Sequence, residues 1–302
     1  MPPDRHLRRL LARTTALAAL AALAVMATGA HAAPPATTIL FVGNSFTFGA
    51  PANAAPLVQS YRPQSVTDLN GSGIGGVPAL FKAFTEQAGL HYEVSLETIP
   101  GAGLNDHYEQ KLGTIVKTWD KVVLQSYSTL DAKRPGNPEL LIRYSGLLAK
   151  AFHDKNPKVR VMLNATWSRA DQTWKPNGAW YGKPISQMAL DLRRGYDSAD
   201  AASPLIDGVI PTGEAWNRAI GSGVADPNPY DGIQAGQVNL WAPDNYHASP
   251  YGYYLEALTI FGAVTGKDPR SLGANDHVAR DLGIDAAVAG ALQGVAAEQL
   301  GR

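Results

Sequence analysis

The sequence predicts an α/β fold in which helices cover both faces of a parallel sheet. Short apolar segments rich in β-formers recur at wide spacing, at 38–43, 92–99, 121–125, 159–163 and 208–211. Segments with helical periodicity separate most of them. Strands that alternate with helices are joined by crossover connections, which make neighbouring strands parallel and bury both faces of the sheet.

The helical segments are recognised by their apolar spacing and their end signals. Apolar residues recur at intervals of three and four along 77–88, and Gly89 follows as a C-terminal cap. Segments 138–153 and 187–202 show similar periodicity. Ser249 and Pro250 are typical of the N-cap and first position of a helix that follows His247. That helix directs inward Tyr251, Tyr254, Leu255, Leu258 and Phe261.

Three irregular stretches lie at 49–76, 170–184 and 225–238, where Pro, Asn, Ser and Gly are frequent. We interpret them as loops rather than linkers, because no separate core-forming sequence lies beyond them. The sequence therefore predicts a single domain over 33–302, with a loop insertion at about 49–76.

The first 32 residues have the layout of a secretory signal peptide. Four arginines precede an apolar run at about 15–26, and small residues follow, ending at Ala32. The apolar run is shorter than the roughly 20 residues that a membrane-spanning helix needs. We expect cleavage near Ala32 and a secreted or periplasmic protein.

Composition excludes several classes of function. Removing residues 1–32 takes away four of the 26 basic residues and one of the 26 acidic residues, which leaves 22 against 25. No basic run remains, so we expect neither nucleic acid nor a membrane anchor among the partners. The chain has no cysteine, which rules out disulfides, a thiolate nucleophile and a cysteine zinc site.

Chemically active residues follow the predicted strands, where ligand sites form in parallel α/β sheets. Ser45 follows the first strand, Gly103 the second and Gln125 the third. Asp244 and His247 lie three residues apart just before the helix that Ser249 and Pro250 begin. A carboxylate at this spacing can accept from Nδ1–H, which leaves Nε2 free to take a proton from a serine.

Three sequence blocks, in order, resemble those of the SGNH (GDSL-like) hydrolase superfamily. They are "ILFVGNSFTFG", "IPGAG" and "DNYHAS", and they span nearly all of 33–302. The resemblance implies a flavodoxin-like three-layer α/β/α sandwich and ester cleavage without metal or cofactor. It also implies that Ser45 is the nucleophile, His247 the base and Asp244 its orienter, with the N–H groups of Ser45 and Gly103 in the oxyanion hole.

The third block departs from the family pattern, which normally supplies an asparagine amide to the oxyanion hole. The sequence "QSYS" stands in its place. Simple register places Tyr127 at the asparagine position, whereas Gln125 carries the nearby amide donor. We expect Gln125 to complete the oxyanion hole, with Tyr127 as the alternative.

The expected substrate is a short acyl ester, such as an acetyl group on a carbohydrate or a small ester. The segment after Ser45 has few large aliphatic residues, and Trp167, Trp174 and Trp180 offer rings for stacking on a sugar. Two alternatives stay open: an acyltransferase using the same site, and a non-catalytic carbohydrate-binding protein.

We interpret His107 as a surface residue near the start of a helix.

Overall fold

A six-stranded, entirely parallel sheet forms the centre of the protein. The computed structural model describes residues 35–49 and 55–302, and the predicted signal peptide lies outside the described residues. The structured unit is Ala36–Arg302. The strands are β1 (Thr37–Gly43), β2 (Thr67–Asp68), β3 (Tyr92–Thr98), β4 (Lys121–Leu124), β5 (Arg160–Asn164) and β6 (Val209–Ile210).

The strand order is β2-β3-β1-β4-β5-β6. Without the two-residue edge strand β2, this is the flavodoxin-like order 2-1-3-4-5. β1 lies between β3 and β4, with Phe41 opposite Leu96 on one side and Val123 on the other. The run Ile39–Val42 is fully buried because helices cover both of its faces.

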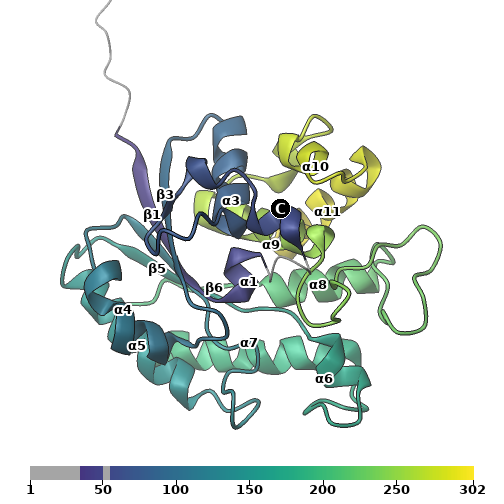
Figure 1. Ribbon diagram of the computed structural model, residues 1–302, viewed down its shortest axis with the longest axis horizontal. Coiled ribbons are helices and arrows are strands. Elements are labelled where there is room, and N and C mark those ends of the chain that lie inside the picture. Colours follow the sequence, from purple (N-terminus) through teal and green to yellow (C-terminus); the bar gives the residue numbers. More distant parts are fainter. Residues whose placement is uncertain (1–34, 50–54) are drawn as a thin grey trace, which may run out of the picture. The chain divides into compact units, whose positions relative to one another are not determined.

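One layer packs against the face of the sheet that carries Ile39 and Phe41. Figure 1 shows its main helices, α3, α9, α8 and α11, together on one side of the strands. The members of this layer and its connections are α1 (Ser45–Phe48), α2 (Pro56–Gln59), η1 (Pro63–Ser65), α3 (Gly76–Gln87), α8 (Thr212–Gly221), α9 (Pro250–Thr265), η2 (Pro269–Leu272), α10 (His277–Asp281) and α11 (Ala286–Gln299).

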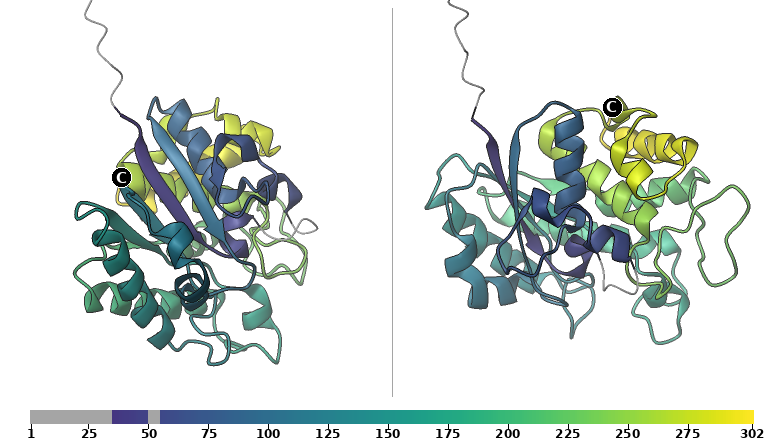
Figure 2. Two further views of the ribbon diagram at one scale, coloured as in Figure 1. Left: turned by 60° about the vertical axis from the view of Figure 1, so that its left-hand side comes forward. Right: turned by 45° about the horizontal axis from the view of Figure 1, so that its top comes forward.

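The other layer packs against the face that carries Leu40 and Val42. It consists of α4 (Leu104–Ile115), α5 (Glu139–His153) and α7 (Ile185–Ala202), and the short helix α6 (Ala170–Trp174) lies beside α7. The two turned views in Figure 2 keep the sheet between these two groups of helices. The predicted three-layer α/β/α sandwich is therefore confirmed.

The structure agrees closely with the helix predictions. α9 starts where expected: Pro250 is its first residue, and the Ser249 side chain accepts a hydrogen bond from the Gly252 N–H at 3.4 Å. Most side chains of α9 are buried, so its apolar surface runs around the helix rather than along one stripe.

The predicted insertion at about 49–76 contains α2, η1 and β2, and is therefore more regular than a loop.

Candidate active site

The turn after β1 presents Ser45 at the carboxyl edge of the sheet. Asn44 caps α1, and its Oδ1 accepts from the Phe46 N–H at 3.0 Å. Its Nδ2 donates to the carbonyls of Ala102 at 2.8 Å and Ser126 at 3.2 Å. Asn44 therefore ties the turn to the loops that follow β3 and β4. We did not single out Asn44 from the sequence, although an asparagine before a helix is typical of an N-cap.

Gln125 fixes the same turn from β4. Its Oε1 accepts from the Asn44 N–H at 3.0 Å and from the Thr47 hydroxyl at 3.1 Å. Its Nε2 donates to the Ser126 carbonyl. This packing requires glycine at position 43, because an added Cβ would lie 2.2 Å from Thr47 Oγ1 and 2.6 Å from Gln125 Oε1.

The structure brings Ser45, His247 and Asp244 together from opposite ends of the domain. His247 Nε2 lies 2.8 Å from Ser45 Oγ, and His247 Nδ1 lies 2.7 Å from Asp244 Oδ2. With the proton on Nδ1, the imidazole donates to Asp244 and accepts from the serine hydroxyl. This arrangement can draw the proton from Ser45 as its oxygen attacks an electrophilic carbon.

Asp244 is held in its charged form. Burial raises its pKa, but hydrogen bonds from the His247 side chain and from two backbone N–H groups lower the pKa to about 2. Its Oδ1 accepts from the N–H groups of Tyr246 at 3.0 Å and His247 at 2.9 Å. Asn245 adopts a left-handed conformation, with φ of 57°, which lets the chain fold around the carboxylate. Asp244 can therefore orient the imidazole and stabilise its protonated form.

Tyr253 supports Ser45 from α9. Its hydroxyl donates to the Ser45 carbonyl at 2.9 Å, and the side chain is fully buried. Burial raises the pKa of Tyr253 well above its ordinary value, so the hydroxyl remains a neutral donor. The nucleophile turn is thus anchored to α9 as well as to the sheet.

The candidate oxyanion donors are engaged to different degrees. The backbone N–H of Ser45 makes no hydrogen bond among the described residues. The Gly103 N–H donates to Asp106 Oδ2 at 2.9 Å, and the Tyr127 hydroxyl donates to the same oxygen at 2.7 Å. The hydrogen bonds of Gln125 do not support its expected role as the third donor, because its amide nitrogen is already used within the turn.

The three tryptophans occupy different environments. Trp167 is completely buried and stacks between Phe46 and Trp216, at ring-centroid distances of 4.2 Å and 4.6 Å. The prediction that Trp167 forms a sugar platform is therefore wrong, because neither face of its ring is open. Trp174 is 40% exposed, and its Nε1 donates to the Pro227 carbonyl at 3.4 Å.

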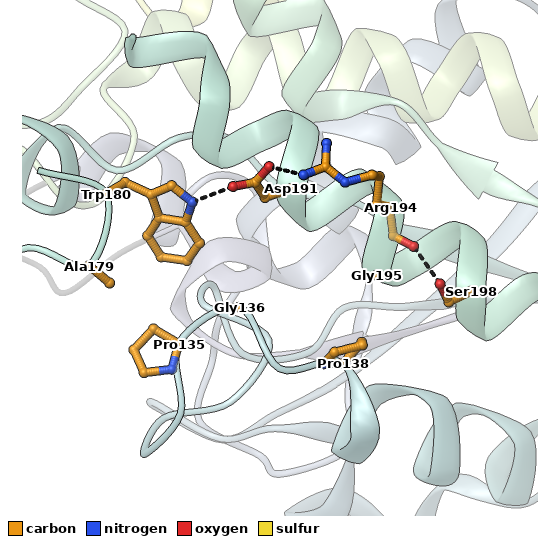
Figure 3. Close-up of a pocket in the computed structure, with 9 residues that line it drawn as sticks. All are labelled: Pro135, Gly136, Pro138, Ala179, Trp180, Asp191, Arg194, Gly195 and Ser198. Carbon is orange, nitrogen blue, oxygen red and sulfur yellow. Dashed lines mark hydrogen bonds and ion pairs between the residues drawn. The ribbon is translucent and has the colours of Figure 1, made fainter. Parts of the chain in front are cut away.

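Trp180 lines a cavity of about 380 Å³ between α7 and the loop that precedes α5 (Figure 3). Its ring is 6% exposed, and its Nε1 donates to Asp191 at 2.8 Å. The residues that line this cavity do not include Ser45 or His247. Trp180 therefore packs in the wall of this cavity and does not belong to the Ser45 site.

The interpretation of His107 as a surface residue is wrong. His107 is fully buried, and its Nδ1 is paired with the equally buried Glu97. The sequence carries no local sign of this pairing, because Glu97 lies on β3 and His107 on α4.

Two further findings concern the described part of the chain. Residues 35–49 and 55–302 contain no group of three or more His, Asp or Glu side chains placed to hold a metal ion. No helix within these residues is long and apolar enough to cross a membrane.

Comparison with known proteins locates the fold. No family model matches the sequence, and no curated protein matches it. Among solved structures, a DUF4886 family protein from Bacteroides uniformis ATCC 8492 is similar, with a TM-score of 0.56 and 18% identity over 88% of this chain and 95% of that one. At this identity the similarity concerns the fold alone.

Two further solved structures match with TM-scores below 0.5. One is a putative GDSL-like lipase from Parabacteroides merdae ATCC 43184, with a TM-score of 0.48 and 18% identity over 76% of this chain and 95% of that chain. The other is a family 3 carbohydrate esterase from Clostridium thermocellum, with a TM-score of 0.46 and 15% identity over 76% of this chain and 99% of that chain.

Proposed function

We propose that the protein is a serine ester hydrolase of the SGNH type. The observation that carries the proposal is the continuous hydrogen-bonded series from Ser45 Oγ through the His247 imidazole to the Asp244 carboxylate. A hydroxyl needs an adjacent base to become a nucleophile, and the base needs a partner that fixes its tautomer. All three parts lie at hydrogen-bonding distance at the carboxyl edge of a parallel sheet.

The reaction proceeds in two halves. Ser45 Oγ attacks the ester carbonyl carbon while His247 Nε2 takes the hydroxyl proton, which gives a tetrahedral intermediate. As the intermediate collapses, His247 protonates the leaving alcohol and Ser45 keeps the acyl group. His247 then takes a proton from water, and the hydroxide attacks the acyl carbon. Collapse of the second intermediate returns the proton to Ser45 and releases the acid.

The oxyanion is stabilised first by the Ser45 N–H, which is unpaired among the described residues. The Gly103 N–H joins it when the substrate oxygen displaces the Asp106 carboxylate from that donor. Gln125 acts in this proposal as a support of the nucleophile turn. The Tyr127 hydroxyl becomes available together with Gly103, because both donate to the same Asp106 oxygen.

A matched set of variants tests the nucleophile. Ser45→Ala removes the attacking oxygen, and kcat for p-nitrophenyl acetate should fall by at least roughly three orders of magnitude. The melting temperature should stay close to that of the wild type. Ser271→Ala is the control, since this serine is exposed on η2. A fluorophosphonate probe should label wild-type Ser45 and leave Ser45→Ala unlabelled. Wild-type protein that neither hydrolyses esters nor takes up the probe would support a binding protein instead.

The proposed substrate carries a short acyl group, acetyl above all, on a carbohydrate. Of the three predicted tryptophans, only Trp174 is substantially exposed. Tyr230 is exposed too, and its ring contacts Lys175, the residue after Trp174. Trp174 also donates to the carbonyl of Pro227, in the same loop as Tyr230. Exposed rings of this kind stack on sugar faces. The kcat/KM for p-nitrophenyl acetate should exceed that for the octanoate, and acetylated glycans should release acetate.

Trp174→Ala tests the sugar platform separately from the chemistry. This variant should lose activity on an acetylated glycan while it keeps activity on p-nitrophenyl acetate. Tyr181→Ala is the matched control, because it removes another exposed ring from the neighbouring segment. A preference for octanoate, with no acetate released from any glycan, would overturn the proposed substrate. Transfer of the acyl group to an added sugar would identify the acyltransferase alternative.

We further propose that the protein acts outside the cytoplasm. The proposal rests on the signal-peptide layout of residues 1–32. Mass spectrometry of the protein isolated from its producing cells should find a chain that begins at residue 33. An intact N-terminus in the purified protein would contradict this.

A further inference from the structure

We infer that Arg169 is a positioning residue that holds the ring of Tyr246 against the imidazole of His247. The inference rests on the proposed function, since it concerns the geometry of the proposed catalytic base. Arg169 is the N-cap residue of α6, in the segment that follows β5. Tyr246 and His247 belong to a loop almost eighty residues further along the chain.

The three side chains form a stack. The guanidinium carbon of Arg169 lies 3.6 Å from the centroid of the Tyr246 ring. The Tyr246 ring in turn lies 4.0 Å from the His247 ring, centroid to centroid, at an interplanar angle of 34°. A guanidinium at this distance is attracted by the negative face of an aromatic ring. Arg169 therefore fixes the position of the Tyr246 ring, which in turn contacts the imidazole.

The arginine itself is held on three sides. Its Nε and Nη2 donate to the two carboxylate oxygens of Asp171, at 3.0 Å and 2.6 Å. Its Nη1 donates to Ser128 Oγ at 3.3 Å, in the loop after β4. The side chain is only 15% exposed. A bidentate pair with a carboxylate fixes the plane of the guanidinium as well as its position.

The same segment also holds the backbone of the loop that carries the base. The Asp171 N–H donates to the Asn245 carbonyl at 3.1 Å, and the Trp167 Nε1 donates to the Tyr246 carbonyl at 3.4 Å. Asp244, at the start of the loop, is 38% exposed and lacks a covering layer. These contacts therefore replace the packing that a buried loop would have.

The stack contributes a restraint that the hydrogen bonds of His247 lack. Bonds at Nδ1 and Nε2 fix the two ends of the imidazole, but they resist tilting of the ring plane only weakly. A flat ring against one face resists that tilt by direct contact. Because a misplacement of about 1 Å costs on the order of a hundredfold in rate, a loosened imidazole lowers kcat.

The charge of Arg169 is compensated where it lies. His247 becomes positively charged as it takes the serine proton, and a bare cation behind Tyr246 would oppose that step. Asp171 pairs with both Nε and Nη2 of Arg169, and Asp244 faces His247 from the other direction. The arginine therefore supplies its attraction to the ring without a large net charge next to the base.

The kinetic test is a double-mutant cycle. Arg169→Ala and Tyr246→Ala should each lower kcat for p-nitrophenyl acetate by about tenfold to a hundredfold, with KM changed by less than about threefold. The double variant should lose no more than either single variant, because the two residues act through one stack. Arg169→Lys should recover part of the loss, and Tyr246→Phe should retain wild-type kcat because it keeps the ring.

The control is Arg270→Ala. Arg270 on η2 likewise donates through Nε and Nη2 to an aspartate two residues away, Asp268. The substitution Arg270→Ala should leave kcat unchanged. Losses from Arg169→Ala and Tyr246→Ala that multiply in the double variant would overturn the inference. A rise in KM without a fall in kcat would overturn it as well, since that pattern belongs to a substrate-binding residue.

A spectroscopic readout separates this inference from the proposed function. The proton on His247 Nδ1, shared with Asp244, should give a low-field NMR signal in the wild type that broadens in Arg169→Ala and returns in Arg169→Lys. Arg270→Ala should leave it unchanged. An unaltered signal in Arg169→Ala would overturn the inference whatever the activity. Absence of Ser45-dependent activity, with the signal broadened as expected, would overturn the proposed function alone.

Discussion

Gly43→Ala is the substitution for which the structure gives the sharpest expectation. Gly43 ends β1, immediately before the turn that presents Ser45. An added Cβ would lie 2.2 Å from Thr47 Oγ1, 2.6 Å from Gln125 Oε1 and 3.0 Å from Thr47 Cβ. Rotation of the threonine hydroxyl does not remove the last contact, and Gln125 is fully packed. The turn must therefore move.

The size of the effect follows from the contacts that are lost. Gln125 Oε1 accepts two buried hydrogen bonds, from the Asn44 N–H and the Thr47 hydroxyl. Each has a net value of about 0.5–1.5 kcal/mol. Overpacking adds about 1–3 kcal/mol. The free energy of unfolding should thus fall by roughly 2–6 kcal/mol, equivalent to a drop in Tm of roughly 4–24 °C. If Ser45 Oγ is displaced by about 1 Å, kcat should fall about a hundredfold.

Thermal unfolding and the hydrolysis of p-nitrophenyl acetate measure the two effects. Gly113→Ala is the control, because an added Cβ there in α4 has no atom within 4 Å. That variant should gain roughly 0.5–1 kcal/mol, since alanine is the better helix former. A Gly43→Ala protein with wild-type Tm and kcat would refute the argument that Gln125 and Thr47 enforce glycine at this position.

Three further predictions come from the ionisable groups. Because hydrogen bonds hold the pKa of Asp244 at about 2, this carboxylate should stay ionised above pH 4 and add no proton to the pH profile of kcat there; a slope of two protons on acidification would count against this. Asp244→Asn should lower kcat by about three to four orders of magnitude through the wrong tautomer. Burial raises the pKa of Glu256 well above its ordinary value, so the folded protein carries it neutral while the unfolded chain ionises it. The free energy of unfolding should therefore fall as pH rises from 5 to 8, and it should fall more steeply in the wild type than in Glu256→Gln. Urea unfolding at each pH measures this free energy, and equal slopes against pH in the two proteins would contradict the prediction.

The strand and helix pattern was largely predictable from the sequence. The five predicted strands coincide with β1, β3, β4, β5 and β6 to within one or two residues at each end. Each is a short apolar run between turn-forming residues, and such runs specify a strand locally. β2 was missed because its two residues, Thr67 and Asp68, carry no periodic signal and join the sheet only by pairing with β3.

The sequence by itself also placed Ser45, Asp244 and His247. Each lies at a point where a local rule applies: Ser45 at the end of an apolar strand, and the other two just before a capped helix. Ser249 and Pro250 start that helix independently of any other segment. A parallel sheet then has to bring such ends to one edge, so the order of the elements was enough to predict that the three would meet.

Only the tertiary structure decided which neighbours complete the site. Trp167 is stacked in the core and Gln125 is turned toward Asn44 and Thr47, although composition alone made both plausible contacts of the substrate. Arg169 reaches Tyr246 from a segment that no motif connects to it. Such assignments depend on the direction of single side chains between elements far apart in sequence. That direction is set by packing density and hydrogen-bond pairing in three dimensions, which leave no periodic trace along the chain.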